Sequence, residues 1–358
     1  MKKIFLYVLD VLFIVCISVL AVNLVFKDQD LGEMLADLDK ANKLWLLGGA
    51  VLSVLFVAGE AVIIKYLLRL FRVKIPLRRC LKYSFVGFFY SYITPSASGG
   101  QPAQMYYMKK DGICLGHSSL IMVVITLTFK AVLVVMGAAL LLLHPLTVID
   151  NTGEYFWLLL LGFGLNLAYI SALLFLLIRP ALACRLMNGA VKLLCRLHLI
   201  KSSKRDAYME KVRRLEKTYT DGAKYIKSHY KAVINVFVIT CAQRLFYFAV
   251  TWVVYKSYGL SGTSFLSLIT MQVMIAVSVE MLPLPGAAGI TEACFLVMQG
   301  AAFGESLVRP GMLLSRGLTF YVILIIGALV TLGAHVVTVK KHSRTEDESK
   351  NKNEELAA

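Results

Sequence analysis

The sequence predicts an all-α polytopic membrane protein with about six full transmembrane helices and two re-entrant hairpins, each broken by proline and glycine. Of its 358 residues, 58% are hydrophobic, whereas soluble domains typically have about 45–50%. The mean hydropathy is +0.71. Long apolar segments alternate with short polar loops, and two of these segments are interrupted where a helix should cross the bilayer. This pattern excludes a soluble domain.

The two interruptions, residues 92–102 and 281–292, are the features around which the chain is organised. Proline removes a backbone donor and clashes with the preceding turn, and glycine permits backbone angles closed to other residues. Non-helical backbone at membrane depth is tolerated only where it is buried in protein or lines a watery cavity. We therefore expect a gate around a polar cavity. Its residues would be Pro95, Gly99, Gly100, Gln101 and Pro102 in the first stretch and Pro283, Pro285, Gly286 and Gly289 in the second.

Before the first interruption, the charges of the loops assign each segment to a side of the membrane. Residues 4–26 are long enough to span, and because they follow Lys2 and Lys3 we expect a retained anchor that starts in the cytoplasm. The acidic connection 27–43 suits the outer side. Residues 44–71 then return to a cluster of lysine and arginine, which the positive-inside rule places in the cytoplasm.

The next segments are predicted to form a hairpin and two spans. Residues 77–93 enter the membrane, and after the break residues 103–112 are too short and polar to cross, so we expect a hairpin that opens to the cytoplasm. Residues 118–143 then cross outward. Residues 144–154 contain two acids and no lysine or arginine and are expected to be an outer loop, from which residues 155–178 return.

Residues 179–231 form the most basic segment, and apolar residues recur in it at helical spacing. We expect a cytoplasmic amphipathic helix lying on anionic lipid headgroups. The net charge of +16 could also indicate nucleic-acid binding, but an anionic leaflet explains it more simply. No direct nucleic-acid partner is therefore expected.

The second half is predicted to repeat the first in inverted orientation. Residues 232–258 cross outward, residues 265–282 re-enter from outside, residues 290–303 form a short limb after the break, and residues 310–339 cross inward. Both termini are then cytoplasmic. Such inverted repeats build a midplane binding site in many transporters.

Two domains follow from this organisation. Residues 1–340 form the membrane domain, and residues 341–358 form a polar tail that we expect to be disordered.

Ionisable residues within spans are costly and are candidates for function. They are Glu60, Lys65, Lys130, Arg244, Glu280, Glu292 and Arg316. Lys65 is expected to reach the interface.

Lys130, Arg244 and Arg316 are candidates for binding a lipid phosphate, and Glu280 and Glu292 for holding an amine or a coupling proton. The half-helices expected after Pro102 and Gly289 would add backbone N–H groups to an anion site. The alternative is a set of purely structural ion pairs with Glu60, Glu280 or Glu292. The scattered cysteines and histidines indicate no disulfide framework, metal site or catalytic residue, and no cofactor is expected.

Three motifs in order, SGGQP at residues 98–102, YYMKKDG at 106–112 and PLPGAAGITE at 283–292, resemble the membrane-embedded, flippase-like domain of bacterial lysylphosphatidylglycerol synthases, also called multiple peptide resistance factors. The resemblance covers nearly all of residues 1–340. One departure is the Ala287-Ala288 pair, where relatives often have glycine.

The resemblance implies a lipid translocase of the bacterial inner membrane. It would move phosphatidylglycerol, aminoacylated phosphatidylglycerol such as lysyl-phosphatidylglycerol, or a related anionic phospholipid between leaflets, and so contribute to resistance to cationic antimicrobial peptides. In the family a separate C-terminal acyltransferase domain makes the aminoacylated lipid, and the short tail after Val339 leaves no room for it. The chain is therefore not expected to be an enzyme by itself.

Three alternatives stay open beside the translocase. They are a phosphatidylglycerol lysyltransferase, a non-transporting scaffold for a separately encoded aminoacyl-lipid synthase, and a flippase for a polyprenyl-phosphate carrier. The resemblance also makes a separate synthase and a second copy of the chain candidate partners.

Overall fold

The computed structural model describes residues 40–94, 97–179 and 227–336, with isolated positions between 185 and 225. Every regular element in these residues is a helix, and 5 helices are long and apolar enough to cross a membrane. The predicted all-α polytopic class is confirmed. The predicted first span at 4–26, Pro95, most of the basic segment 179–231 and the tail 341–358 lie outside the described residues.

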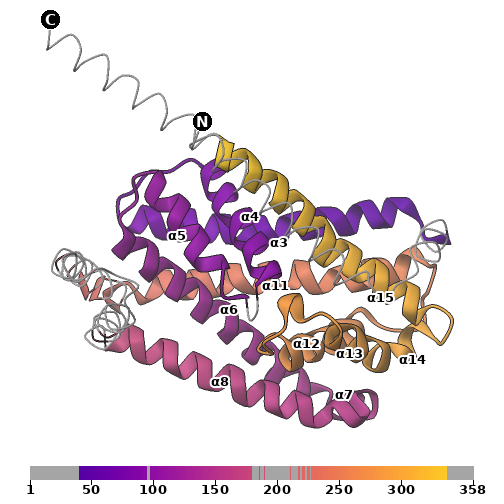
Figure 1. Cartoon of the computed structure of the whole chain (residues 1–358). Helices are drawn as coiled ribbons and strands as arrows, with labels where there is room; N and C mark the ends of the chain where they lie inside the picture. The colour runs from indigo at the N-terminus through magenta and orange to yellow at the C-terminus, as the bar shows by residue number, and fades with distance from the viewer. Residues whose placement is uncertain are drawn as a thin grey trace, which may run out of the picture.

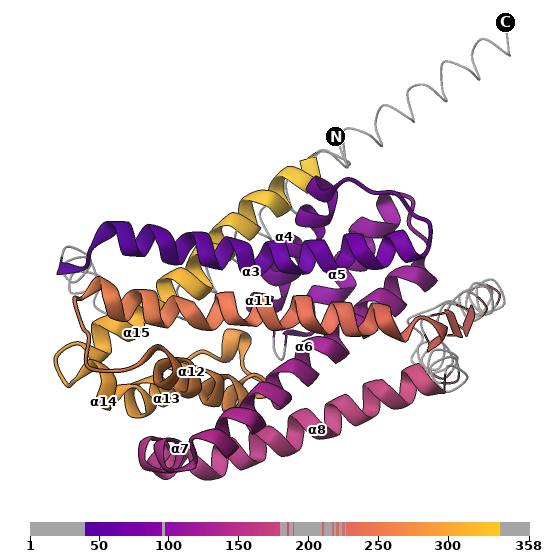
Figure 2. The ribbon, with the colours of Figure 1, turned by 180° about the vertical axis from the view of Figure 1, so that it is seen from behind.

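Two long helices, α3 (Lys43–Leu70) and α11 (Tyr230–Ser257), lie side by side at the centre of the fold. Figure 2 shows them running antiparallel along the length of the molecule. Small residues permit this close approach: a Cβ on Gly59 would meet the side chain of Gln243, and one on Gly49 would lie 3.5 Å from the side chain of Val253, both on α11. Close backbone packing of this kind is how helices associate where the solvent is itself apolar.

The first predicted hairpin is formed by α4 (Leu77–Ile93) and α5 (Gly100–Lys110). Thr94 spans the break between them, because its hydroxyl donates to the carbonyl of Tyr90 at 2.6 Å and accepts from the N–H of Gly99 at 2.9 Å. The hydroxyl thus satisfies backbone groups at the end of one helix and the start of the next, which lipid could not do.

The start of α5 differs from the prediction. The short limb expected at 103–112 begins earlier, at Gly100, so Pro102 lies inside the first turn of the helix. Proline is tolerated there because the first N–H groups of a helix have no intrahelical partner.

The third long helix, α6 (Leu115–Leu143), leads to a segment that the sequence analysis assigned to a loop. Residues 144–154 are instead largely helical, since α7 (Pro145–Thr152) begins with proline at a first-turn position and is followed by the 3-10 turn η2 (Gly153–Tyr155). The helix α8 (Phe156–Ile178) then runs along one edge of the molecule, with α7 at its end (Figure 1).

The second predicted hairpin comprises α12 (Phe265–Val279), the 3-10 turn η4 (Pro285–Ala287), α13 (Ile290–Met298) and α14 (Gly300–Phe303). Its break contains three residues with positive φ, Gly286 at 56°, Ala287 at 50° and Gly289 at 84°. The sequence departure at Ala287 therefore places an alanine in a conformation that favours glycine.

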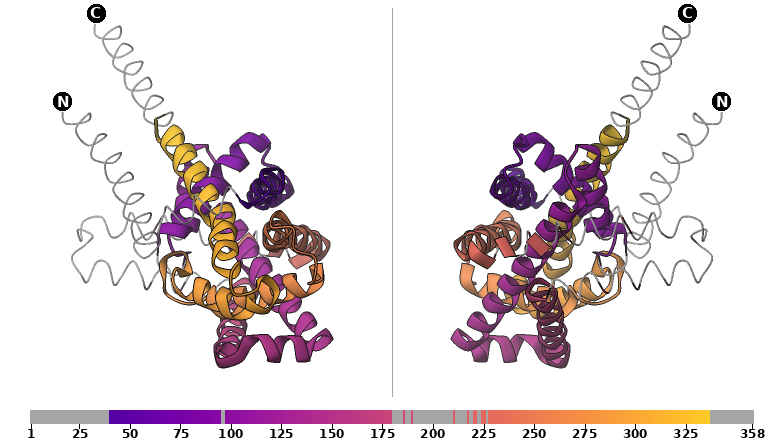
Figure 3. Two further views of the ribbon diagram at one scale, coloured as in Figure 1. Left: turned by 90° about the vertical axis from the view of Figure 1, so that its right-hand side faces the viewer. Right: turned by 90° about the vertical axis from the view of Figure 1, so that its left-hand side faces the viewer.

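The last helix, α15 (Val308–Arg316), continues through a π-helical turn, η5 (Gly317–Tyr321), to residue 336. Figure 3 shows this helix, in yellow, crossing the bundle obliquely. It packs closely on α4, because a Cβ on Gly327 would meet the side chain of Phe89 and the carbonyl oxygen of Phe85.

The two hairpins lie at opposite ends of the long direction of α3 and α11 (Figures 1 and 2). The order α3, α4, α5, α6 is followed by a second series of matching elements, α11, α12, α13, α15. This arrangement agrees with the predicted inverted repeat. The break of the second hairpin, η4, contacts α4 of the first, so the hairpins meet in the interior.

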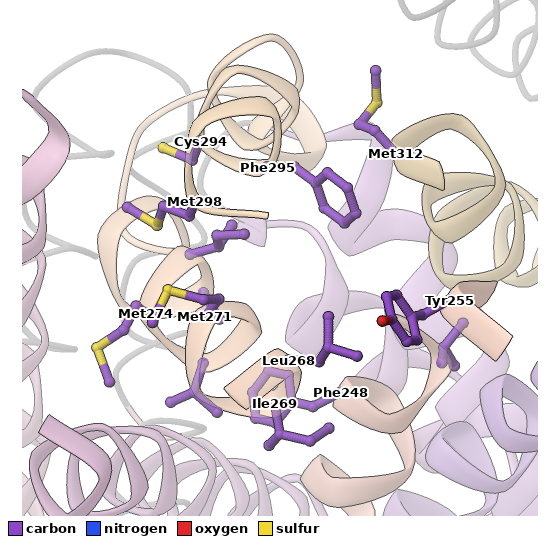
Figure 4. Close-up of a cluster of buried hydrophobic side chains, with 14 of the residues drawn as sticks. Phe248, Tyr255, Leu268, Ile269, Met271, Met274, Cys294, Phe295, Met298 and Met312 are labelled. Atoms are coloured by element: carbon purple, nitrogen blue, oxygen red, sulfur yellow. The ribbon is translucent and has the colours of Figure 1, made fainter. Parts of the chain in front are cut away.

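A large apolar core surrounds α12, which has almost no exposed face. Figure 4 shows part of it, with Phe248 and Tyr255 of α11 beside Leu268 and Ile269 of α12. A second core joins α3 to α4, α5 and α6. The polar site described next lies among these apolar elements.

Candidate functional site

Two cations from different helices share one carboxylate at the end of α12. Arg244 of α11 donates from Nη1 to Oε1 of Glu280 at 2.5 Å and from Nη2 to Oε2 at 2.9 Å. Lys130 of α6 donates from Nζ to the same Oε2 at 3.0 Å. Bidentate pairing is the geometry in which a guanidinium binds either a carboxylate or a phosphate.

Arg244 is fixed by further contacts on its other side. Its guanidinium carbon lies 3.5 Å from the ring centroid of Phe129, the residue before Lys130, and this stacking adds a cation–π attraction. The side chain of Arg244 is 1% exposed, that of Lys130 11% and that of Glu280 22%. Glu280 is therefore the most accessible member of the triad.

A second ion pair fixes the second break. Arg316, the last residue of α15 before its π-helical turn, donates from Nε to Oε1 of Glu292 at 2.6 Å and from Nη2 to the carbonyl oxygen of Gly286 at 2.9 Å. Oε2 of Glu292 is buried without a hydrogen-bond partner. One oxygen of this carboxylate thus remains free to accept a hydrogen bond.

Aromatic side chains connect the two hairpins. Tyr92, at the end of α4, stacks on Phe320 of the π-helical turn with centroids 4.6 Å apart and donates to the carbonyl oxygen of Thr319 at 3.2 Å. The guanidinium carbon of Arg316 lies 4.7 Å from the centroid of the same Phe320 ring. Tyr92 and Phe320 therefore connect the end of α4 to the Arg316 pair.

The predicted binding residues form two ion-paired groups. Lys130 and Arg244 pair with Glu280, and Arg316 pairs with Glu292. Structural ion pairs with Glu280 and Glu292, the alternative to phosphate binding, are thus formed.

The predicted gate residues that the structure describes differ in exposure. Gly100 is buried, Gly99, Gln101 and Gly286 are half-buried, and the more exposed positions are Pro102, Pro283 and Gly289. Gln101 reaches the hydroxyl of Thr126 on α6 at 3.4 Å. Pro285 begins η4.

The helix starts are less open to an anion than expected. The N–H of Gly99, just before α5, is taken by Thr94. In the first turn of α13 stands Glu292, whose negative charge already complements the helix dipole. The side-chain cations are therefore better placed to bind an anion than the backbone N–H groups at these helix starts.

The hydrogen-bonded pair Glu60 and Gln104 was not included among the predicted binding residues. Glu60 of α3 is 8% exposed and accepts a hydrogen bond at Oε1 from Nε2 of Gln104 on α5 at 2.5 Å. The sequence showed Glu60 as an ionisable residue within a span, but it gave no sign of a neutral partner. Gln104 could not be identified because glutamine in a short polar limb is ordinary.

A further ion pair lies at the turn after α5, outside the membrane-spanning segments. Asp111 accepts from Nζ of Lys82 at 2.7 Å and from the hydroxyl of Tyr83, both on α4. Partial burial acts to raise the pKa of the Asp111 carboxyl, but these hydrogen bonds and the charge of Lys82 outweigh it and leave the pKa below its ordinary value. The contact joins the two limbs of the first hairpin.

Lys130 and Arg244 carry two positive charges against the single negative charge of Glu280, so this triad holds one unbalanced positive charge within an apolar bundle. A charge in such surroundings is expensive unless it is compensated. A singly charged anion would compensate it.

A protein-family model described as "Lysylphosphatidylglycerol synthase TM region" matches residues 8–327. No match was found among curated proteins.

Proposed function

Because the chain belongs to the family of lysylphosphatidylglycerol synthase transmembrane regions, we propose that it binds the phosphate of an anionic phospholipid at Lys130 and Arg244 and moves this lipid between leaflets. The observation that carries the proposal is the unbalanced positive charge of the triad. A phosphate diester has the missing charge and the paired oxygens that a guanidinium binds.

The accessibility of Glu280 suggests how the lipid enters. Glu280 occupies the cations with the bidentate geometry that a phosphate would adopt. A phosphate that arrives on its side would displace the carboxylate, and Glu280 would rebind when the lipid leaves. The buried cations are thus never left without an anion, which would cost several kcal/mol.

The free oxygen of Glu292 favours an aminoacylated lipid among the anionic candidates. Oε2 of Glu292 is buried and unpartnered, and an ammonium group has three donors to offer it. Lysyl-phosphatidylglycerol carries both a phosphate and amines. Membership of the family supports the same lipid, because the family is that of the lysylphosphatidylglycerol synthase transmembrane regions.

The charge of the loops supports an orientation with both termini in the cytoplasm of a bacterium. Movement of the aminoacylated lipid, whose two amines outweigh its one phosphate charge, to the outer leaflet would then lower the negative charge of the cell surface. Resistance to cationic antimicrobial peptides is the expected consequence.

The test is lipid movement in vesicles that contain the purified protein. The vesicles carry a fluorescent phosphatidylglycerol or a fluorescent phosphatidylcholine with the same acyl chains, and an impermeant quencher reports the outer leaflet. We expect faster movement of phosphatidylglycerol than in protein-free vesicles and than of phosphatidylcholine. Equal acceleration of both lipids would contradict recognition of the anionic headgroup.

The role of the triad is tested with Lys130→Gln. Loss of one charge-assisted hydrogen bond to phosphate should slow phosphatidylglycerol movement by about tenfold. The matched control is Lys74→Gln, since Lys74 is exposed in the connection between α3 and α4 and should behave as the unmodified protein. An unchanged rate in Lys130→Gln would remove the triad from the binding site.

The amine is tested with Glu292→Gln. The amide oxygen can still accept from Arg316, but the negative charge that favours an ammonium is lost. Movement of lysyl-phosphatidylglycerol should slow while that of phosphatidylglycerol continues. If the natural lipid is a polyprenyl phosphate, which has no amine, its movement should be unaffected by this change.

A further inference from the structure

We propose that the stacked rings of Tyr92 and Phe320 form the gate of the lipid pathway. They must separate before a headgroup can pass between the two hairpins, and this step limits the rate of lipid movement. The inference rests on the proposed function and assigns its moving contact. It stands on the contacts of the two rings, on the backbone around them and on the packing of the helices that carry them.

The two rings belong to the two halves of the inverted repeat. Tyr92 is in the last turn of α4, two residues before the Thr94 that spans the first break. Phe320 is in the π-helical turn that follows α15. The hairpins lie at opposite ends of the bundle and meet in its interior (Figures 1 and 2). A headgroup that crosses from one end to the other must therefore pass the place where they meet.

Both hairpins contact the ring of Phe320, which is buried. From the first hairpin, Tyr92 lies on the ring with the centroids 4.6 Å apart and an angle of 21° between the ring planes. From the second hairpin, Gly286 lies so close that an added Cβ would overlap the ring. Displacement of this one side chain therefore loosens the contact between the first hairpin and the second break.

The contact between α4 and the continuation of α15 differs along its length. A Cβ on Gly327 would lie 3.0 Å from a carbonyl oxygen of α4, so the two backbones are in close contact there. Nearer the break, α4 reaches the other helix through the side chain of Tyr92, which stacks on Phe320 and donates to the carbonyl oxygen of Thr319 at 3.2 Å. A ring stack and a neutral hydrogen bond are weak enough to be broken and remade. The helices can therefore part at the stack while Gly327 acts as the pivot.

The backbone around the stack has the features of segments that switch between conformations. Phe320 is in a π-helical turn, a rare geometry that often occurs at functional sites. In the two breaks, Ala97 and Ala287 have positive φ angles of 54° and 50° although neither is glycine. Such strain persists only where the surrounding structure imposes it, and it is concentrated at switch regions. Separation of the rings would remove one of the contacts that impose it.

The gate shares a side chain with the site proposed for the lipid amine. The guanidinium carbon of Arg316 lies 4.7 Å from the centroid of the Phe320 ring, and the same guanidinium binds Glu292 and the carbonyl oxygen of Gly286. When Phe320 moves, Arg316 loses this cation–π contact. An amine that binds Glu292 therefore acts on an arginine that also holds the gate.

The experiment measures lipid movement with the gate held closed. In a cysteine-free chain, Tyr92→Cys and Phe320→Cys together place two thiols where the rings meet, and a short thiol cross-linker that dithiothreitol cleaves joins them. Vesicles that contain the full chain carry the fluorescent phosphatidylglycerol, and an impermeant quencher that does not reduce disulfides reports the outer leaflet. Cross-linking should reduce the rate to that of protein-free vesicles, and dithiothreitol should restore it.

The matched control is the pair Trp45→Cys and Trp252→Cys. These two rings have centroids 5.6 Å apart and join α3 to α11, which pack closely and do not move when the gate opens. The same cross-linker should leave the rate of this pair unchanged.

Tyr92→Phe tests the gate without a cross-link. It keeps the ring and removes the hydroxyl that donates to Thr319, so the gate should open more readily. The rate should rise about fivefold, as expected for the loss of a neutral hydrogen bond. The control, Tyr66→Phe, removes a hydroxyl that joins α3 to Asn235 of α11 and should leave the rate unchanged.

The outcomes separate this inference from the proposed function. Unchanged movement after the Tyr92 and Phe320 positions are cross-linked, an equal loss in the control pair, or failure of the two thiols to cross-link in the folded protein overturns the gate alone. A rate in Tyr92→Phe that is equal to or below that of the unmodified protein also overturns it, and this variant decides if the double variant does not fold. Absence of any movement by the unmodified chain refutes the proposed function, and the gate falls with it.

Discussion

Arg316 makes two contacts that a lysine could not make together. Its Nε donates to Glu292 while Nη2 donates to the carbonyl oxygen of Gly286, and its guanidinium carbon lies 4.7 Å from the ring centroid of Phe320. The planar guanidinium presents several donors in fixed directions, whereas a lysine ammonium is a single compact charge. One side chain thus ties α15 to both the break and the short limb of the second hairpin.

Arg316→Lys should therefore destabilise the protein although the charge is kept. We expect the free energy of unfolding to fall by about 2 kcal/mol, which is typical for the loss of a hydrogen bond to a charged group. The melting temperature in detergent should be lower. Arg309→Lys is the matched control, because Arg309 is exposed on the same helix. Equal melting temperatures for the two variants would show that the contact to Gly286 contributes nothing.

Asp111 gives a prediction that depends on pH. Its pKa is below the ordinary value of 3.8 in the folded protein, so the carboxylate stabilises the fold above that value and stops doing so as the pH falls through the lower, folded pKa. Asp111→Asn should lower stability by about 1 kcal/mol at neutral pH, a figure reduced for solvent screening.

The difference between Asp111→Asn and the unmodified protein should be constant from neutral pH down to about pH 4 and vanish in stronger acid. Thermal unfolding in detergent at a series of pH values measures it. A difference that grows toward acid would have the wrong sign for a carboxylate with a lowered pKa.

At the scale of elements, glycines decide how closely the broken helices approach their neighbours. Gly286 has a φ of 56° and a Cβ there would overlap the ring of Phe320, which stacks on Tyr92. Gly289 has a φ of 84° but has nothing within 4 Å of an added Cβ. A side chain at Gly289 would therefore meet only backbone strain, whereas one at Gly286 would meet both backbone strain and steric overlap.

Alanine at both positions should cost stability, but unequally. Gly289→Ala should show only the strain of a positive φ, about 1–3 kcal/mol, and Gly286→Ala should lose more because the Phe320 ring must also move. Comparison of their melting temperatures checks this order. The reverse order would place Phe320 away from the break.

Gly87 is the corresponding position in the first hairpin. Gly87→Ala should push Gln104 away from Glu60, leaving a buried carboxyl without its donor at a cost of about 1–3 kcal/mol. Gly164→Ala, in α8 with nothing within 4 Å, should be neutral or slightly stabilising, because alanine is the better helix former. Thermal unfolding of both variants makes the comparison.

At the scale of the whole molecule, the two hairpins occupy opposite ends of the bundle and their breaks meet inside it (Figures 1 and 2). The charges of the loops predict that the first hairpin opens to the cytoplasmic side. The turn after α5 and the connection before α12 should therefore face different compartments.

Single cysteines test this topology in a cysteine-free background. Lys109→Cys and Ser261→Cys each introduce a thiol at an exposed position. An impermeant maleimide added to intact cells should label Ser261→Cys, and Lys109→Cys should react only after the membrane is opened. Labelling of both in intact cells would rule out hairpins that enter from opposite faces.

The sequence by itself determined the class of protein, the long spans of the described region and the position of both breaks. Hydropathy and the backbone preferences of proline and glycine act over a few residues, so they can be recognised locally. Local rules were less accurate at the ends of helices and in the connections. The helix α5 begins before Pro102, because proline suits the first turn of a helix. Residues 144–154 are largely helical, although their charge suggested a loop.

Only the tertiary structure decided which charges meet. Lys130 and Glu280 are 150 residues apart in the chain, and Arg244 joins them from a third helix. The same three-dimensional arrangement left Glu60 with a glutamine instead of a cation. An ion pair forms between whichever buried charges the packed helices bring within a few ångströms, and that distance depends on the whole bundle rather than on any stretch of sequence.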